Sequence, residues 1–266
     1  PEIVSGVFNN RSTGAPITIL FKNSNTRSGD YEKQKAVPRP GHADFVASKK
    51  FDGFQDYRGG GHFSGRLTVA FVAAGVVAKK IITPNPSPQG ERGTNTGIKS
   101  TSTMLEIGGE RDLEKGLQKA IDAKDSIGGI VECRVNDLPI GLGEPFFDSA
   151  ESLISHAVFA IPAVRAIEFG TGFAAAKMFG SQHNDAILND SGTTRTNHAG
   201  GIVGGLTNGN ELVFRIAIKP TSSTPTAQQS LNWDTHSVEN FSVKGRHDLC
   251  IALRVPVILE AVKAIV

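Results

Sequence analysis

The chain has 266 residues, of which 39% are hydrophobic and 20% are charged, and its formal net charge is +2 at pH 7. These values are ordinary for a soluble enzyme, and the near-neutral charge excludes a strongly basic nucleic-acid-binding surface. No apolar run reaches the roughly 18 residues of a membrane-spanning helix, which excludes a membrane protein. The sequence shows no signal peptide, so we expect a cytoplasmic protein. Its two cysteines, Cys133 and Cys250, form neither a disulfide framework nor a metal-spaced pair. We therefore expect both to be buried reduced thiols, and we expect no bound metal.

The first third of the chain is predicted to be rich in strands. Residues 1–6 have the character of a strand already begun, and the β-branched and aromatic residues at 16–21 predict another. Residues 27–61 are rich in Arg, His, Pro and Gly, and long irregular segments in a folded domain are usually functional or disordered; the Arg and His favour function. Residues 67–82 are apolar on nearly every face and end near two lysines, which predicts a buried helix with cations in its last turn.

The rest of the chain mixes helices with strands. Residues 83–93 have the composition of a loop, and a helix is expected over 112–124. Asp148 and Glu151 have the spacing of a capping box for a further helix, which Pro162 ends. Because the elements do not alternate strictly as βαβ units, the sequence favours an α+β layered fold, in one domain over residues 1–266. The remaining predicted elements are strands over 131–138, 163–169 and 212–218 and a helix over about 256–266.

Four segments concentrate groups that bind phosphate or exchange protons. Glycines let a backbone lie against a ligand, and the N-terminus of a helix offers free N–H groups to an anion. Arginine, lysine and histidine side chains accompany these glycines, so the segments are candidates for an anion-binding site. The four are Arg39 with His42 and Asp44, residues 59–66, residues 197–205 followed by 219–223, and residues 244–248.

Each segment has a plainer alternative when it is considered alone. A glycine-rich run is more often a turn than a phosphate cradle, and His42 or His198 would more often be a satisfied histidine than an acid–base group. Residues 246–248 could form a surface ion cluster, and Lys219 could simply be solvated at the end of a strand. Phosphate-loop, dinucleotide-binding, metalloprotease and serine-hydrolase motifs are absent or fail on spacing, which excludes the common versions of those sites.

Considered together, the segments resemble the signatures of the chorismate synthase family, in the family's order and across almost the whole chain. Any one match would be weak, but the ordered set points to this family. The matching stretches are Ser5-Gly6-Val7-Phe8, Arg39-Pro40-Gly41-His42-Ala43-Asp44, Tyr57-Arg58-Gly59-Gly60-Gly61, Gly141-Leu142-Gly143-Glu144-Pro145, Asn197-His198-Ala199-Gly200-Gly201-Ile202, Lys219-Pro220-Thr221-Ser222-Ser223 and Gly245-Arg246-His247-Asp248.

The resemblance implies a fold, a reaction and a cofactor. The fold would be a β-α-β sandwich, with helices packed between antiparallel sheets, assembled as a homotetramer. The reaction would be the 1,4-elimination of phosphate from 5-enolpyruvylshikimate 3-phosphate to give chorismate, the last step of the shikimate pathway that leads to aromatic amino acids. It requires reduced FMN without net oxidation or reduction. Whether the chain reduces its own flavin, as an NADP-linked flavoprotein would, or receives FMN already reduced stays open.

The resemblance also assigns roles to matched residues. His42 would protonate the reduced flavin, and Asp248 would lie near flavin N5 on the proton path. Arg39 and Arg66 would bind the anionic substrate. These residue types suit the chemistry, because histidine is the natural general acid at neutral pH and guanidinium groups bind phosphates. The positions matched to flavin binding are His62, Phe63, Ser64, Pro162, Ala163, Gly204, Lys219, Pro220, Thr221, Ser222, Ser223 and Arg246.

The chain departs from the family pattern in several places. The Gly-Glu-Ser-His-Gly motif and the Arg-Arg-Arg-Pro-Gly run of the family's N-terminal segment do not occur, so we expect an N-terminally incomplete domain. His62 stands in place of a commoner arginine, and Leu249 in place of a proline. Two alternatives stay open: a truncated homologue that binds FMN or partner subunits without turnover, and an unrelated nucleotide-binding α+β protein whose glycine loops resemble those of the family.

Overall fold

A four-stranded antiparallel sheet lies at the centre of the computed structural model, which describes residues 1–23, 35–82, 97–243 and 248–266. Its strands, in spatial order, are β5 (Lys99–Ile107), β6 (Gly129–Asn136), β10 (Leu212–Ile218) and β7 (Val164–Phe169). β10 has the bounds expected from the sequence, and β6 and β7 differ from theirs by one or two residues. The long strand β5 was not predicted, because its serines, threonines and lysine interrupt the apolar pattern from which a strand is recognised.

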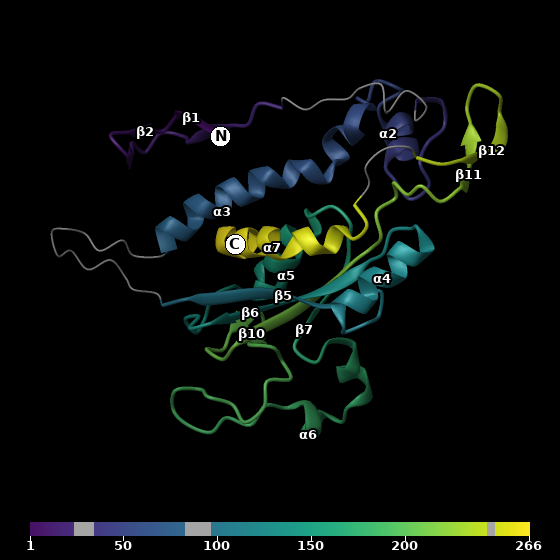
Figure 1. Cartoon of the computed structure of the whole chain (residues 1–266). Coiled ribbons are helices and arrows are strands. Elements are labelled where there is room, and N and C mark those ends of the chain that lie inside the picture. The colour runs from purple at the N-terminus through teal and green to yellow at the C-terminus, as the bar shows by residue number, and fades with distance from the viewer. Residues whose placement is uncertain (24–34, 83–96, 244–247) are drawn as a thin grey trace.

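Helices cover one face of this sheet in two layers (Figure 1). α5 (Ala150–Phe159) and α7 (Val255–Ile265) pack on the sheet, and α3 (Val69–Ile82) packs on α7 from the side away from it. Gly75 makes this close crossing possible, since a Cβ there would lie 2.4 Å from the Cβ of Ala261. The helix expected over 67–82 is confirmed, but its expected burial is wrong: only Gly75 of α3 is buried, and Val76 and Ile81 are exposed.

The sheet forms because apolar and polar residues alternate along its strands. Phe214 and Ile216 of β10 are buried in the core cluster with residues of α5 and α7. Arg215 between them points to the opposite face, where its guanidinium pairs with Glu132 at 3.0 Å and Glu168 at 3.1 Å. One face of the sheet therefore belongs to the hydrophobic core, and the other carries a row of ion pairs.

A hairpin of β1 (Glu2–Ser5) and β4 (Thr18–Leu20) lies beyond α3, on the far side from the central sheet (Figure 1). It confirms the strands expected within 1–6 and 16–21. Every strand pair among the described residues is antiparallel, and helices lie between the hairpin and the sheet. The α+β class is thus confirmed, in an uneven form with the four-stranded sheet on one side of the helices and the two-stranded sheet of β1 and β4 on the other.

Two predicted helix starts have different outcomes. α4 (Leu113–Ala123) is capped by Asp112, whose side chain accepts a hydrogen bond from Lys115 N, as expected for a helix over 112–124. The predicted capping box of α5 is wrong. Asp148 lies in the short helix η4 (Phe146–Asp148), so Ser149 becomes the N-cap, and its Oγ accepts from Ser152 N at 3.1 Å.

The other elements are short. They are β2 (Val7–Phe8), β3 (Arg11–Ser12), η2 (Arg58–Phe63), η3 (Gly65–Thr68), η5 (Gly172–Lys177), α6 (Gly180–His183), β8 (Ile202–Val203), β9 (Leu206–Thr207) and η6 (Ile251–Arg254). Cys133 and Cys250 are free and buried, as predicted, and burial raises the pKa of both thiols. None of the described helices is long and apolar enough to cross a membrane. The loop predicted at 83–93 lies outside the described residues.

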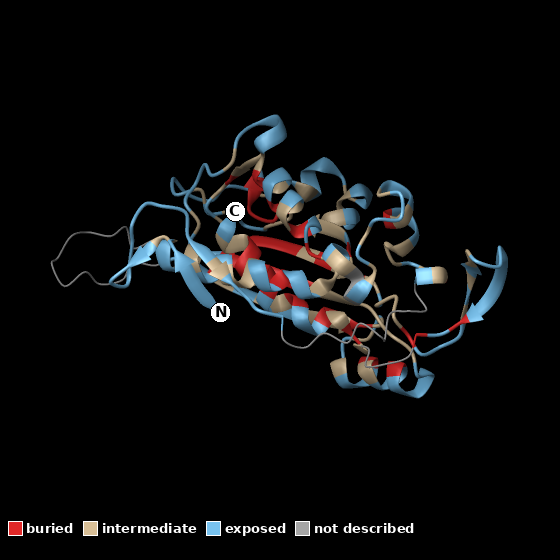
Figure 2. Ribbon diagram, turned by 90° about the horizontal axis from the view of Figure 1, so that it is seen from above, coloured by how far each residue is buried: buried red, intermediate tan, exposed pale blue. Residues whose placement is uncertain are grey.

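A small lobe extends from one end of this body. We call it the hairpin lobe: residues 35–51, which include α2 (Asp44–Lys50), together with residues 228–243, which form the hairpin of β11 (Gln228–Asn232) and β12 (Ser237–Phe241). Figure 2 shows that buried residues concentrate in the central body, whereas the hairpin is exposed except near its base. The lobe has its own small hydrophobic cluster of Val37, Phe241 and Val243, with Ala36 packed against it.

Candidate functional site

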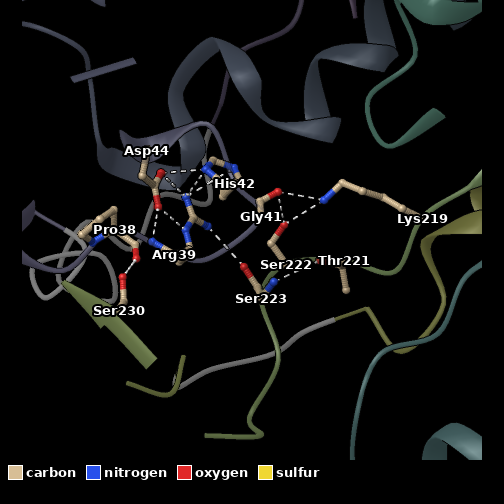
Figure 3. A network of polar contacts seen from close by, with 10 residues as sticks. All are labelled: Pro38, Arg39, Gly41, His42, Asp44, Lys219, Thr221, Ser222, Ser223 and Ser230. Atoms are coloured by element: carbon tan, nitrogen blue, oxygen red, sulfur yellow. Dashed lines mark hydrogen bonds and ion pairs between the residues drawn. The ribbon is translucent and has the colours of Figure 1, made fainter. Parts of the chain in front are cut away.

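Two segments far apart in the sequence meet where β10 ends (Figure 3). Lys219 Nζ donates hydrogen bonds to Gly41 O at 2.8 Å and to Ser222 Oγ at 3.0 Å, and Ser222 Oγ donates to Gly41 O at 2.8 Å. Arg39 Nη1 donates to Ser223 Oγ at 3.2 Å. The backbone of Gly41 has φ +70°, a conformation that favours glycine. The structure therefore brings four predicted site residues into one cluster.

Asp44 organises the N-terminal half of this cluster. Its carboxylate accepts hydrogen bonds from Arg39 N at 3.0 Å, Arg39 Nε at 2.7 Å and Arg39 Nη2 at 2.8 Å. Burial by itself raises the pKa of this carboxyl, but hydrogen bonds and charge from Arg39 and His42 outweigh burial and hold the pKa well below its ordinary value. Asp44 is consequently an anion that fixes a buried guanidinium, since only 5% of the Arg39 side chain is exposed.

The same carboxylate orients His42. His42 Nδ1 lies 2.6 Å from Asp44 Oδ1 and 3.0 Å from Arg39 Nη2. Because an ionised carboxylate is an acceptor only, the proton of this contact belongs to Nδ1, which leaves Nε2 as the ring nitrogen that can exchange a proton with a ligand. The sequence pattern included Asp44 but assigned it no role, so its function as the anchor of His42 is a finding of the structure.

A second cation stands beside Lys219. β7 and β10 pair Ala166 with Ala217 and Val164 with Ile218, so Arg165 is the extra residue of a β-bulge at the end of the sheet. Bulges re-aim side chains and are common next to active sites. Burial lowers the pKa of the Lys219 ammonium, and the charge of Arg165 lowers it further. Two neighbouring cations that repel each other form a place where a bound anion is stabilised.

Several other predicted residues lie around this cluster. Ala163, at φ +75°, accepts a hydrogen bond from Lys219 N at 2.9 Å, so the pair Pro162–Ala163 adjoins the cluster directly. Phe63 lines a cavity of about 10 Å³ together with Asp44. The ring of His62 lies 4.5 Å from that of Phe63, between centroids. η2 therefore borders the hairpin lobe.

Ser64 and Arg66 interact with each other at the start of η3. Ser64 Oγ is the N-cap acceptor for Arg66 N at 3.2 Å, and it also accepts from Arg66 Nη1 at 3.4 Å. The Arg66 side chain is exposed. The structure thus gives Ser64 a helix-capping role, and the binding roles of both residues stay predictions.

Two predicted residues, Gly204 and Asp248, make no hydrogen bond or ion pair with this cluster among the described residues. Gly204 lies in the turn between β8 and β9, which adjoins the start of β10, and the seven residues of β10 separate it from Lys219 by about 20 Å at roughly 3.3 Å per residue. Asp248 forms an ion pair with Arg254, and 40% of its side chain is exposed. Arg246 lies outside the described residues. Their cofactor and proton-transfer roles stay predictions.

His198 fits the plainer alternative of a satisfied histidine. Its backbone N donates to Asp185 Oδ1 at 2.8 Å, and its Nδ1 lies 3.1 Å from Thr171 Oγ1. Asp185 also accepts from Ala199 N at 2.9 Å and from Thr196 Oγ1 at 2.6 Å. Burial alone raises the pKa of Asp185, and these hydrogen bonds reverse the effect and lower it. This motif therefore fastens loops near the start of β10.

The turn between α4 and β6 supports the cluster, and sequence reasoning did not find it. Ser126 Oγ donates to Thr221 O at 2.8 Å, and Thr224 Oγ1 donates to Asp125 Oδ1 at 2.5 Å. Ile127 N donates to Leu249 O at 2.9 Å. An acidic residue and a serine after a helix indicate a turn, but nothing in the sequence tells which distant segments such a turn holds.

Comparisons with known proteins agree with this arrangement. A curated chorismate synthase from Chitinophaga pinensis is 67% identical over 264 residues, which cover 99% of this chain and 76% of that protein. Chorismate synthases from Dehalococcoides mccartyi and Korarchaeum cryptofilum are 40% and 41% identical, over 100% and 99% of this chain and 78% of each relative.

A solved structure described as the crystal structure of chorismate synthase has the same fold. The two structures match with a TM-score of 0.67 and 24% sequence identity, and the match covers 99% of this chain and 74% of the chain in the solved structure. The sequence model of the family described as chorismate synthase matches residues 1–266. With the ordered motifs, the fold and these relatives in agreement, the chain belongs to the chorismate synthase family.

Proposed function

We propose that the protein is a lyase that converts 5-enolpyruvylshikimate 3-phosphate to chorismate and phosphate. Membership of the family supports an enzymatic role in the shikimate pathway. The observation that carries the proposal is the meeting of two distant segments, which places Arg39 and His42 beside Lys219, Ser222 and Ser223. A substrate with a phosphate and two carboxylates requires such a concentration of cations.

The substrate-binding and proton-transfer roles follow from the chemistry of the cluster. Arg39 is held by Asp44 through three of its donors, and this orientation suits a guanidinium that presents its remaining edge to an anion. Arg66 is the second proposed substrate ligand. His42 would give a proton from Nε2, since Nδ1 is committed to Asp44.

The residues around Lys219 fit the phosphate of FMN. Cationic and hydroxyl groups gather here, from Lys219, Arg165 and the side chains of Thr221, Ser222 and Ser223. Burial first, and then the charge of Arg165, lowers the pKa of Lys219. Pro162, Ala163 and Pro220 adjoin them, and His62, Phe63 and Ser64 are proposed to lie against the flavin. Reduced FMN, when bound, would supply the electron density that the departure of phosphate requires.

The remaining parts of the proposal rest on the resemblance. Asp248 would belong to the proton path, and Arg246 and Gly204 would contact the flavin. Assembly as a homotetramer is supported by large apolar side chains left exposed on the protein, among them Phe146 at 90% and Phe147 at 92%. A cytoplasmic location, and one domain built on the main core cluster, complete the proposal.

The test is anaerobic chorismate formation by the protein, supplied with 5-enolpyruvylshikimate 3-phosphate and chemically reduced FMN. Steady turnover would support the proposal. Tight FMN binding without turnover would instead favour a flavin-binding homologue that has lost the reaction, and absence of both would count against the function altogether. Omitting the chemical reductant and adding NADPH tells whether the protein reduces its own flavin.

Three variants separate the proposed roles. We expect His42→Ala and Asp248→Ala to lower kcat about 100-fold or more while FMN affinity stays near that of the wild type, because general acid–base groups contribute roughly 10²- to 10⁴-fold. Lys219→Ala should weaken FMN binding about tenfold or more, as expected for a charged hydrogen-bond donor. Wild-type turnover in either of the first two variants, or unchanged flavin affinity in the third, would contradict the corresponding role.

A further inference from the structure

The β11–β12 hairpin fastens the loop that leads into α2. Ser230 Oγ donates to Pro38 O, and Trp233 N donates to Ala36 O at 3.0 Å. Within the described part of the chain, β11 and β12 pair with each other and with no other strand. The hairpin therefore adds nothing to the central sheet. Phe241 at its base and the following Val243 share a small hydrophobic cluster with Ala36 and Val37, so apolar packing also joins the hairpin to this loop.

The side chain of Trp233 lies at the first turn of α2. Its ring centroid is 6.4 Å from that of Phe45, which directly follows Asp44. Trp233 and Asp44 also line the same cavity of about 10 Å³, which has room for about one water molecule. The indole thus packs beside the residue that anchors Arg39 and His42.

The indole contributes through its ring rather than through its N–H. Trp233 Nε1 is buried and has no hydrogen-bond partner among the described residues. A buried donor without a partner destabilises the folded state where no water reaches it. What remains as a favourable contribution is the aromatic contact with Phe45 and the apolar area that the ring covers. A phenylalanine at this position would keep much of that contact and remove the unpaired donor.

We propose that Trp233 is a positioning residue of the reaction: its ring fixes the first turn of α2 and so holds Asp44, which in turn holds Arg39 and His42. The consequence for turnover rests on the proposed function, whereas the mechanical part rests on the contacts alone. The Asp44 carboxylate lies 2.7 Å from Arg39 Nε and 2.6 Å from His42 Nδ1, so a small displacement of Asp44 disturbs both groups at once. Displacements of about 1 Å can lower a rate by roughly 100-fold.

The mechanical part is tested without the reaction, by hydrogen exchange of backbone amides in the intact protein. In Trp233→Ala we expect the amides of residues 39–47 to lose protection, while those of β10 keep theirs. Trp233→Phe should restore the protection. Leu231→Ala is the matched control, because Leu231 is an exposed apolar residue of the same hairpin, 39% accessible. Wild-type protection of residues 39–47 in Trp233→Ala would overturn the proposal.

The consequence for the reaction is tested by a double-mutant cycle. We expect Trp233→Ala to lower kcat/KM by about 10- to 100-fold, and Trp233→Phe and Leu231→Ala to stay near the wild type. If Trp233 acts through Asp44, Trp233→Ala should lower kcat/KM much less in the Asp44→Asn background than in the wild-type background. Full additivity, or unchanged kcat/KM in Trp233→Ala, would overturn the proposal. An inactive wild type would refute the proposed function and with it any effect on turnover, and the exchange experiment would still decide whether Trp233 anchors the loop.

Discussion

The central body and the hairpin lobe of this protein are stabilised by different interactions. In the body, the sheet and helices bury a continuous set of aliphatic side chains with Phe214 at their centre, fully buried. In the lobe, the apolar cluster has only three buried members, and the densest interactions are the hydrogen bonds and the ion pair around Asp44. The body therefore depends mainly on apolar burial, and the lobe depends mainly on charge.

Because of this difference, the residues that set the stability of the fold are mostly not the residues of the proposed site. The cluster of Arg39, His42 and Lys219 lies where the two regions meet, with Lys219 at the end of the sheet and Arg39 and His42 on the lobe. Changes in the core should therefore unfold the whole protein, whereas changes in the lobe should disturb the site and leave most of the fold intact.

The largest effect on stability is expected in the body. Leu259 of α7 is fully buried, and Leu259→Ala should lower the free energy of unfolding by about 2–5 kcal/mol, because it removes apolar contacts and leaves a cavity. Leu253→Ala provides the same chemical change at a residue that is 47% exposed, and its effect should stay within about 1 kcal/mol. Urea denaturation measures both. Equal losses in the two variants would contradict the assignment of α7 to the main core.

A smaller, pH-dependent effect is expected in the lobe. The folded-state pKa of Asp44 lies well below the ordinary value of about 3.9, so its contribution to stability is complete above that value and is lost as the pH falls below it. Asp44→Asn should lower the free energy of unfolding by about 2 kcal/mol at pH 7, as expected for lost hydrogen bonds to charged groups. The difference from the wild type should stay constant down to about pH 5 and then shrink as the pH is lowered further, roughly from 5 to 2.

A matched control distinguishes this pair from general effects of acid. Asp190 is an exposed aspartate with no ion pair among the described residues, so Asp190→Asn should differ little from the wild type at any pH. Denaturant titrations of the three proteins across this pH range give the comparison. A difference between Asp44→Asn and the wild type that stays constant with pH would show that the Asp44 carboxylate does not stabilise the fold through its charge.

Sequence patterns predicted the body better than the lobe, for a physical reason. β10, α4 and α7 have apolar patterns that follow their buried faces, and α3 is a continuous apolar run, so the bounds of all four could be predicted to within a few residues. β5, β11 and β12 were missed, because polar residues such as Ser, Thr, Gln and Asn occupy much of their length. Strands of this kind depend on tertiary pairing, which a local pattern does not show.

The candidate site was predictable as a set of residues but not as an arrangement. Ordered motifs pointed to Arg39, His42 and Lys219, and the structure places these three together. The supporting residues Asp125, Arg165 and Trp233 carry no local signal, because each acts through a contact with a distant segment or through a bulge that depends on strand register. Gly204 was predicted beside Lys219 from the resemblance alone, and the structure separates the two by the length of β10.

The smallest effect is expected at the junction of the two regions, from Arg165. We expect Arg165→Met to weaken FMN binding about threefold near pH 7, because an exposed charge contributes only modestly to binding an anion. The same change removes a cation that lowers the pKa of Lys219, so that pKa should rise toward its ordinary value. Lys219 would then stay charged to a higher pH. The loss of FMN affinity at alkaline pH should accordingly begin at a higher pH in the variant than in the wild type.

The sole tryptophan of the chain provides the measurement. FMN absorbs where tryptophan emits, so binding should quench the fluorescence of Trp233, and titrations between about pH 7 and 11 would bracket the ordinary lysine pKa of about 10.4. Arg195→Met is the matched control, since it removes an exposed arginine with no ion pair in the described parts of the chain. The threefold difference should also narrow at high ionic strength, where exposed charges are screened. If Arg165→Met and Arg195→Met gave identical profiles, Arg165 would have no part in binding the anion, and Lys219 would be the cation that the central body contributes to the flavin phosphate.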